Sequence, residues 1–403
     1  MLEKECPMIN SPLTFSRRQW LGGLSATAAT VMFSAYVHGA QRAAAPARPP
    51  GRILDLHHHF GSPRWIKRMA ESQRQGWQAF QEYTPARAIE TMDEGGTQTA
   101  FISCTEPGVW FGDDFERERQ DAIALSRDMN EYGAGMVSDH KGRFGLFAVL
   151  PLPDIDASLR EIEYVFDTLK ADGVGVLTSY GNMWLGDVRL QPVFDELNRR
   201  GAVVYTHPTD APCCHNLANA NPATLEWFTD TARSIMSLIA ENTGTRLGGG
   251  GVLGRGRAAG APAGGVGGAQ PAQPSAATRY NNIRFIWSHA GGTLIGAVSR
   301  VVGGVDAASL AGNPGVNTRL YHVRRFYYDT AASANPIAMQ GLKTLLGGTS
   351  HIVFGTDLPY GTSAQMRRAL QAVGFSAAEL AGIERDNALT ILSNYRALPS
   401  PAI

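Results

Sequence analysis

The feature that most constrains the fold is a regular alternation of short apolar segments with segments of helical periodicity. The apolar segments lack the strict in-out alternation of a half-exposed strand, so they suit strands buried on both faces of a parallel sheet. Between two of them, Leu159, Ile162 and Phe166 share one face of a helix. The eight predicted strands are residues 53–56, 99–103, 144–150, 173–178, 202–206, 283–288, 326–329 and 351–355.

Eight strands, each followed by helical sequence, predict an α/β fold of the (β/α)8 TIM-barrel type over residues 52–396. A doubly wound open sheet is the competing fold. Polar residues at the carboxyl ends of several different strands favour the barrel, because barrel enzymes place their chemistry there.

Two segments stand outside this alternation. Residues 247–277 are rich in Gly, Ala and Pro, which predicts a disordered insertion between the fifth helix and the sixth strand; a domain boundary is the alternative. Residues 1–45 contain Arg17-Arg18 before a weakly apolar run, which predicts a twin-arginine-type export signal and linker, and a periplasmic protein. That run is too short and interrupted for an integral membrane domain. An uncleaved anchor or an extension without function remains the alternative, and the cleavage point is open.

Composition excludes other classes of function. The 36 basic and 36 acidic residues leave no formal net charge, so no basic surplus exists to bind nucleic acid. The four cysteines lack paired zinc-type spacing. The adjacent Cys213 and Cys214 are more typical of small buried residues, and their role is open.

The strand ends carry a set of histidines and one aspartate. Alternation along the first strand turns His57 and His59 to one side and His58 to the other. His207, His289 and Asp357 come just after three later strands, whose ends converge at one mouth of a barrel. Imidazoles with one carboxylate suit a divalent metal, Zn²⁺ first and Mn²⁺ as the alternative, with one position open to water or substrate.

These motifs together resemble the amidohydrolase superfamily, in particular the branch that contains aminocarboxymuconate-semialdehyde decarboxylase. The chain is most similar there to the 6-methylsalicylate decarboxylases, through FAVLPLPD, VVYTHPT and FYYDTA. The resemblance implies that His57, His59, His207 and Asp357 bind the metal and that His289 is catalytic. It also implies a homodimer. No lysine in residues 173–181 could bridge two metals, so one metal per chain is expected.

The function expected on this resemblance is a metal-dependent, redox-neutral decarboxylation of a small aromatic carboxylic acid, such as a hydroxybenzoate or 6-methylsalicylate. Asp357 would be the proton donor, assisted by His289. A metal-dependent hydrolase of a lactone, ester or amide is the alternative on the same residues, and a non-catalytic binding barrel is a third hypothesis. Four side chains are candidate substrate contacts: Arg64, Trp65, Tyr180 and Trp184.

Overall fold

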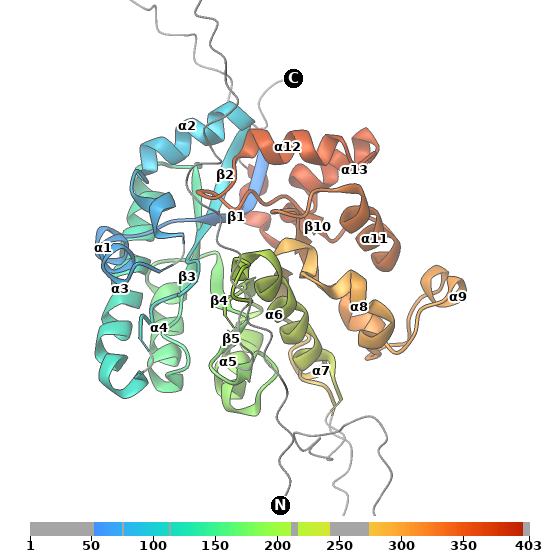
Figure 1. Cartoon of the computed structure of the whole chain (residues 1–403), viewed down its shortest axis with the longest axis horizontal. Helices are drawn as coiled ribbons and strands as arrows, with labels where there is room; N and C mark the ends of the chain where they lie inside the picture. Colours follow the sequence, from blue (N-terminus) through green and yellow to red (C-terminus); the bar gives the residue numbers. More distant parts are fainter. Residues whose placement is uncertain (1–51, 75, 113, 211–216, 242–273, 398–403) are drawn as a thin grey trace, which may run out of the picture. The chain divides into compact units, whose positions relative to one another are not determined.

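The computed structural model describes residues 52–74, 76–112, 114–210, 217–241 and 274–397 (Figure 1). The predicted export signal and Cys213-Cys214 lie outside these residues, as do residues 247–273 of the predicted insertion. Residues 274–277 were predicted to belong to the insertion, but Ser275 caps a short helix, α7 (Ala276–Arg279), in which Ala277 is buried. The end of the insertion was therefore predicted a few residues too late.

Eight parallel strands form the predicted barrel, in the order β1-β2-β3-β4-β7-β8-β9-β10. Their bounds are β1 Ile53–His59, β2 Thr97–Ser103, β3 Phe144–Val149, β4 Gly173–Leu177, β7 Val203–His207, β8 Arg284–Trp287, β9 Tyr327–Asp329 and β10 Ile352–Val353. Backbone bonds close the ring between its first and last strands: the amide of Leu56 donates to Phe354 O at 2.9 Å, and that of His59 donates to Leu358 O at 2.7 Å. The open-sheet alternative is therefore excluded.

Helices surround the strands (Figure 1). They are α1 Pro63–Ser72, α2 Pro85–Gly95, α3 Phe115–Asp139, α4 Ile155–Asp167, α5 Gln191–Arg200, α6 Pro222–Ile239, α7, α8 Leu294–Val301, α9 Ala307–Ala311, α10 Arg319–Arg325, α11 Pro336–Leu346, α12 Ser363–Gln371, α13 Ala377–Ala381 and α14 Ala388–Ile391. Local signals explain where they begin: the Thr84 hydroxyl accepts the amide of Arg87 and the Asp154 carboxylate accepts that of Ala157. Within the described residues, no helix has the length and apolar character needed to cross a bilayer.

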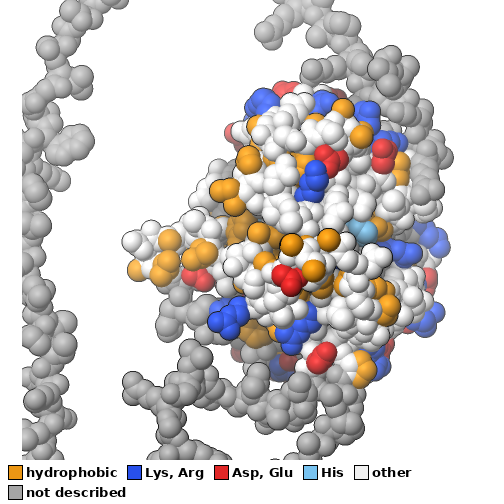
Figure 2. Space-filling model, turned by 90° about the vertical axis from the view of Figure 1, so that its right-hand side faces the viewer, with side chains coloured by type: hydrophobic (Ala, Val, Ile, Leu, Met, Phe, Trp, Pro, Cys, Tyr) orange, Lys and Arg blue, Asp and Glu red, His pale blue; other side chains and the backbone are white. Residues whose placement is uncertain are grey.

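The core has two layers. One apolar cluster lies between the strands and the helices, and a smaller one fills the inside of the barrel, where Phe101, Phe147 and Tyr205 stack in a row. Acidic and basic side chains are interspersed on the outer face in Figure 2, in keeping with the balanced charge. A two-stranded antiparallel hairpin, β5 (Ser179–Tyr180) with β6 (Met183–Trp184), follows β4 and was not predicted.

Candidate metal centre and active site

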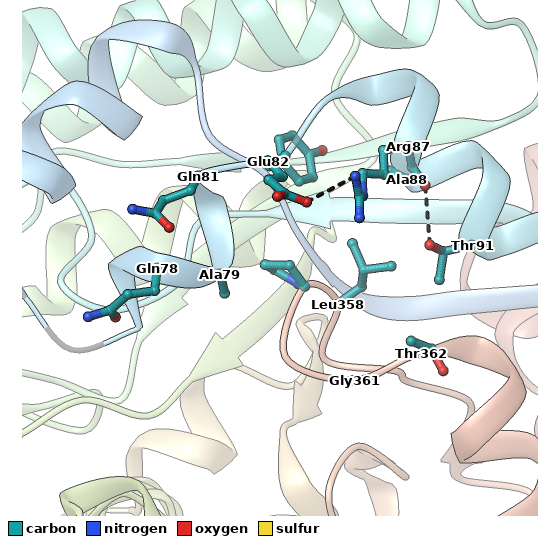
Figure 3. A pocket seen from close by; sticks show the side chains of 12 residues that line it. Gln78, Ala79, Gln81, Glu82, Arg87, Ala88, Thr91, Leu358, Gly361 and Thr362 are labelled. Atoms are coloured by element: carbon teal, nitrogen blue, oxygen red, sulfur yellow. Dashed lines mark hydrogen bonds and ion pairs between the residues drawn. The ribbon is translucent and has the colours of Figure 1, made fainter. Parts of the chain in front are cut away.

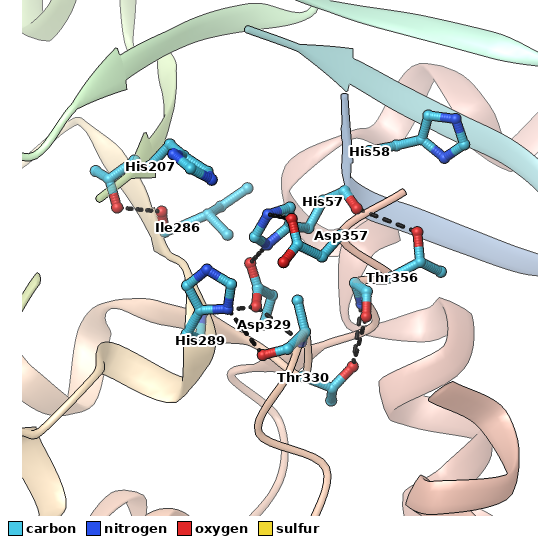
Figure 4. A network of polar contacts seen from close by, with 12 residues as sticks. His57, His58, His207, Ile286, His289, Asp329, Thr330, Thr356 and Asp357 are labelled. Carbon is cyan, nitrogen blue, oxygen red and sulfur yellow. Dashed lines mark hydrogen bonds and ion pairs between the residues drawn. The ribbon is translucent and has the colours of Figure 1, made fainter. Parts of the chain in front are cut away.

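His57 and His59 face the barrel interior because strand β1 is irregular. Leu54 and Leu56 belong to the interior cluster, so a regular pleat would turn His58 inward as well. The register with β2 shifts between Asp55 and His58, and this shift turns His57 and His59 inward instead. His58 points away from the cluster (Figure 4): its Nδ1 lies 3.1 Å from Asp55 and its ring lies against Phe144.

Four potential ligand atoms converge at the mouth of the barrel. The Nε2 atoms of His57 and His59 lie 3.1 Å apart, and each lies 3.1 Å from Oδ1 of Asp357. His207 completes the group, in which all the ligand atoms lie within 4.8 Å of one another. His207 Nδ1 is 2.8 Å from Pro208 O, so this nitrogen carries the proton and Nε2 is left with a lone pair.

These separations fit one bound cation. Two donor atoms that each lie about 2.1 Å from a metal are about 3.0 Å apart at a right angle and about 3.4 Å apart at a tetrahedral angle. The observed 3.1 Å edges are nearer the right-angled value. The mixture of imidazole and carboxylate suits Zn²⁺ and Mn²⁺ alike.

The electrostatics of the group also favour a cation. Burial alone would lower the pKa of His57, but Asp329 and Asp357 raise it to about 10, which means that positive charge is stabilised between the two carboxylates. Burial, opposed by the bond to Asp357, lowers the pKa of His59 to about 4, so its imidazole is neutral and able to act as a ligand near pH 7. Burial opposes ionisation of Asp357, yet the neighbouring histidines hold its pKa well below its usual value.

Asp329, at the end of β9, orients His57 and was missed by the sequence reasoning. Its Oδ2 lies 2.8 Å from His57 Nδ1, and its Oδ1 accepts the amides of His289 and Ala331 at 2.9 and 3.0 Å. A carboxylate that holds Nδ1–H leaves Nε2 of the same ring free for a metal. The signal was present, because Asp329 ends the predicted strand 326–329 just as the other polar residues end theirs.

His289 lies beside the cluster, and its Nε2 has no hydrogen-bond partner among the described residues. Its Nδ1 is 3.0 Å from Ala331 O, its ring stacks on Phe228 at 5.0 Å, and burial lowers its pKa. The imidazole is therefore neutral, with the Nε2 lone pair available to a substrate. His289 and Asp357 line the same cavity.

The backbone at this site is strained. His289, Ala290, Ala332 and Asp357 have φ between 50° and 63°, in the left-handed region that residues other than glycine rarely adopt. Such positions cost on the order of 1–3 kcal/mol each and persist where the surrounding structure fixes them. For Asp357, the surrounding bonds are identifiable: its amide donates to His57 O at 2.8 Å, and its carbonyl accepts the amides of Tyr360 and Gly361.

A cavity of about 290 Å³ opens onto His289 and Asp357; we call it the metal-side cavity. Aromatic side chains form its walls, and none of its described lining residues is Lys or Arg. The lining comprises Gly76, Asn221, Ala223, Trp227, Phe228, His289, Ala332, Asp357 and Tyr360. Trp227 and Phe228 come from α6, and their rings lie against His207 and His289 respectively.

Comparison with known proteins places the chain in a family. A family model described as Amidohydrolase matches residues 54–393, which is most of the chain and the whole barrel. The chain belongs to the amidohydrolase family.

Individual relatives of this amidohydrolase have decarboxylase names. A 6-methylsalicylic acid decarboxylase from Penicillium expansum is 30% identical over 318 residues, covering 76% of this chain and 84% of the relative. The decarboxylase yanB of Aspergillus niger is 29% identical, covering 85% and 88%.

Solved structures of similar fold include a dihydroxybenzoic acid decarboxylase from Polaromonas with bound manganese (TM-score 0.65, 19% identity, covering 86% of this chain and 98% of that one). Another is the 5-carboxyvanillate decarboxylase LigW from Sphingomonas paucimobilis (TM-score 0.66, 17% identity, 85% and 99%). At these identities the likeness shows the fold.

The four candidate substrate contacts lie outside the lining of the metal-side cavity of this amidohydrolase. Arg64 is a half-exposed residue of α1 paired with Asp121, and Trp65 is fully buried beneath it, with its indole N–H donating to Gly108 O. The Trp184 indole donates to the buried Asp230 at 2.6 Å. The Tyr180 hydroxyl accepts a hydrogen bond from the amide of Leu177, and Tyr180 lines a separate cavity of about 310 Å³ that is described below. All four follow strand ends closely in sequence, whereas Trp227 and Phe228 in the wall of the metal-side cavity belong to α6.

A further cavity of about 380 Å³ is lined in part by the residues that follow Asp357 (Figure 3). Leu358 and Pro359 line it together with several residues between 78 and 91, but none of the four candidate metal ligands does. An exposed ion pair between Glu82 and Arg87 spans part of its wall. It is not part of the metal centre.

Proposed function

We propose that this amidohydrolase is a metal-dependent, redox-neutral decarboxylase of small aromatic carboxylic acids of the hydroxybenzoate or 6-methylsalicylate type. One observation carries the proposal: the cluster of His57, His59, His207 and Asp357 opens, beside His289, into a cavity with aromatic walls. The decarboxylase names of the relatives that span the barrel support the same reaction.

A divalent metal held by His57, His59, His207 and Asp357 would bind the substrate's carboxylate or ortho-hydroxyl and stabilise negative charge there. Asp357, kept ionised by its histidine neighbours, takes the proton of the ring hydroxyl and returns it to the ring carbon that bears the carboxylate. The bond between that carbon and the carboxyl carbon then breaks. Its electron pair stays on the ring, which leaves as a phenolate, and the carboxylate leaves as CO2.

His289 assists by hydrogen bonding. Because Nδ1 is committed to Ala331 O, only Nε2 faces the reacting groups, and its lowered pKa keeps it an acceptor. It can hold the hydroxyl proton in line with Asp357 while the C–C bond breaks. The stacked Phe228 fixes the ring in this orientation.

The cavity walls favour the same chemistry. The Trp227 and Phe228 side chains and the methyl groups of Ala223 and Ala332 exclude water from an aromatic ring, and an apolar surrounding favours neutral CO2 over a charged carboxylate. No Lys or Arg of the described lining offers a partner for a second carboxylate. The metal-side cavity therefore suits a monocarboxylate whose single acid group lies at the metal.

Three further properties belong to this proposal. The metal is Zn²⁺ or Mn²⁺: the donor types suit both, and a solved decarboxylase of the same fold contains manganese. The Arg17-Arg18 segment supports export to the periplasm. The protein acts as a homodimer, as the sequence resemblance implies.

The test is CO2 release by the purified, metal-loaded protein from salicylate, 6-methylsalicylate and dihydroxybenzoates. We expect release that requires the metal and is abolished by His207→Ala. Turnover of p-nitrophenyl esters or lactones with no CO2 release from any aromatic acid would instead establish the hydrolase alternative, in which the metal activates water.

A further inference from the structure

Another cavity, of about 310 Å³, is lined in part by Thr209 and Asp210, which closely follow His207 in the sequence; we call it the side cavity. The Thr105 hydroxyl is 3.5 Å from His207 Nε2, and the next residue, Glu106, lines the side cavity. Asp210 of the side-cavity lining accepts the indole N–H of Trp227, which lines the metal-side cavity, at 2.6 Å, so the two linings are in contact. Its lining comprises Arg74, Glu106, Pro107, Trp110, Gly112, Phe115, Leu177, Ser179, Tyr180, Gly181, Thr209 and Asp210.

Two polar groups of the side-cavity lining lack hydrogen-bond partners among the described residues. Glu106 is 8% exposed, and its Oε2 has no partner. Its Oε1 lies 3.5 Å from Arg74 Nη1, which is too long for a strong bond. The indole N–H of Trp110, itself 9% exposed, is also without a partner. Buried polar groups are normally satisfied, so a carboxyl acceptor and an indole donor left open in one lining require an explanation.

The charges of the side cavity restrict what could satisfy them. Glu106 and Asp210 outnumber Arg74, whose Nη2 already donates to Phe111 O at 2.9 Å. A second carboxylate on a ligand would therefore be repelled by the two acidic side chains. Burial raises the pKa of Glu106 to about 7, with Arg74 opposing the rise and Asp210 adding to it, so an anion nearby is unfavourable.

A hydroxyl or amino group has the complementary chemistry. It can donate to the carboxyl of Glu106, and a hydroxyl oxygen can also accept from an indole N–H. Trp110, Tyr180 and Leu177 give the side cavity apolar walls beside these polar groups, as a hydroxylated aromatic ring requires.

We propose that the side cavity is a substrate subsite in which Glu106 accepts a hydrogen bond from a neutral hydroxyl or amino substituent of the aromatic acid, and so selects acids that carry one. The inference rests on the proposed function, because it places the acid group at the metal. Glu106 is then a specificity-determining residue, while the reacting groups stay with Asp357 and His289.

The test measures binding, so that it can be read even if no acid is decarboxylated. Dissociation constants of benzoate, 3-hydroxybenzoate and 4-hydroxybenzoate are measured by calorimetry on the metal-loaded full chain. We expect one hydroxylated acid to bind at least about tenfold more tightly than benzoate, as one buried, well-paired hydroxyl provides. In Glu106→Leu the three constants should agree within about twofold, with that of benzoate unchanged.

Two further variants make the result decisive. Glu163→Leu, which changes an exposed carboxylate of α4, should keep the hydroxyl preference. If Glu106→Leu does not fold, Glu106→Gln keeps the shape and should lower the preference at least about threefold. Equal binding of all three acids by the unmodified protein would overturn the proposal, as would a preference that survives both Glu106 substitutions. Absence of CO2 release from salicylate, 6-methylsalicylate and the dihydroxybenzoates, alongside a Glu106-dependent preference, would refute the decarboxylase function and leave the subsite standing.

Discussion

Asp329→Asn should weaken metal binding although Asp329 is not a proposed ligand. Oδ1 of Asp329 accepts two backbone amides, so the amide oxygen of an asparagine must stay in that position. The new NH2 group is then forced toward Nδ1 of His57, 2.8 Å away in the unmodified protein. Because two donors cannot face each other, the His57 proton moves to Nε2, which removes the lone pair that faces the cluster.

The magnitude follows from this loss of the correct tautomer. Removing an outer carboxylate of this kind typically weakens metal binding 10–100-fold, or about 1.4–2.8 kcal/mol. At a metal concentration about 100 times the dissociation constant of the unmodified protein, the metal raises the free energy of unfolding by about 2.7 kcal/mol. In Asp329→Asn the same concentration should raise it by only about 0.4–1.4 kcal/mol.

The assay is chemical unfolding with metal and with chelator, because the difference between the two isolates the metal's contribution from general destabilisation. Asp230→Asn is the matched control. Asp230 is an equally buried carboxylate that accepts hydrogen bonds from the side chains of Thr178, Ser179 and Trp184. None of these partners is a histidine of the cluster. It should lose stability yet keep the full metal-dependent difference. If Asp329→Asn keeps that difference as well, the tautomer argument is refuted.

Three further predictions concern the same region. His207→Ala should reduce bound metal from about one ion per chain to a trace by elemental analysis and abolish turnover; full occupancy would remove His207 from the ligand set. Gly355→Ala should lower the free energy of unfolding by about 1–3 kcal/mol and weaken metal binding. The added Cβ would lie 2.7 Å from His57 Cβ and 3.0 Å from Asp329 Cβ, so the two side chains would have to move. A metal titration identical to that of the unmodified protein would contradict this. The pKa of Glu106 rises from 4.5 to about 7 on folding, so this residue should make stability fall between those pH values, by at most about 3 kcal/mol. Urea melts from pH 4.5 to 8 should show that Glu106→Gln lacks this fall, and identical pH profiles would exclude a buried, neutral Glu106.

The sequence predicted the strands because each is an apolar run buried on both faces, and that signal is local. It predicted the convergence of His57, His59, His207, His289 and Asp357 because parallel strands bring their carboxyl ends to one mouth. The position of Asp329 at a strand end indicates that it lies at the same mouth, but nothing in the local sequence indicates that its partner is His57, 272 positions away.

The aromatic wall was misplaced for a related reason. Tyr180 and Trp184 follow a strand directly, yet the β5–β6 hairpin turns Trp184 onto Asp230. Trp227 and Phe228 lie inside a helix, where aromatic residues usually indicate core packing, and only the position of α6 over the barrel mouth brings them to the histidines. Glu106 was missed because a single carboxylate after a strand has no distinguishing pattern until its burial is known.

The closure of the barrel between β1 and β10 has a consequence for biosynthesis. Asp55 accepts both the amide and the hydroxyl of Thr356, 301 residues away, and Asp357 follows directly. The ribosome therefore synthesises His57 and His59 long before Asp357. Contacts between residues so far apart in the sequence form slowly during folding. A chain that stops before β10 lacks both the closing strand contacts and one of the four candidate metal-binding side chains. Stable metal uptake should thus report a completed chain, and incomplete products should remain metal-free.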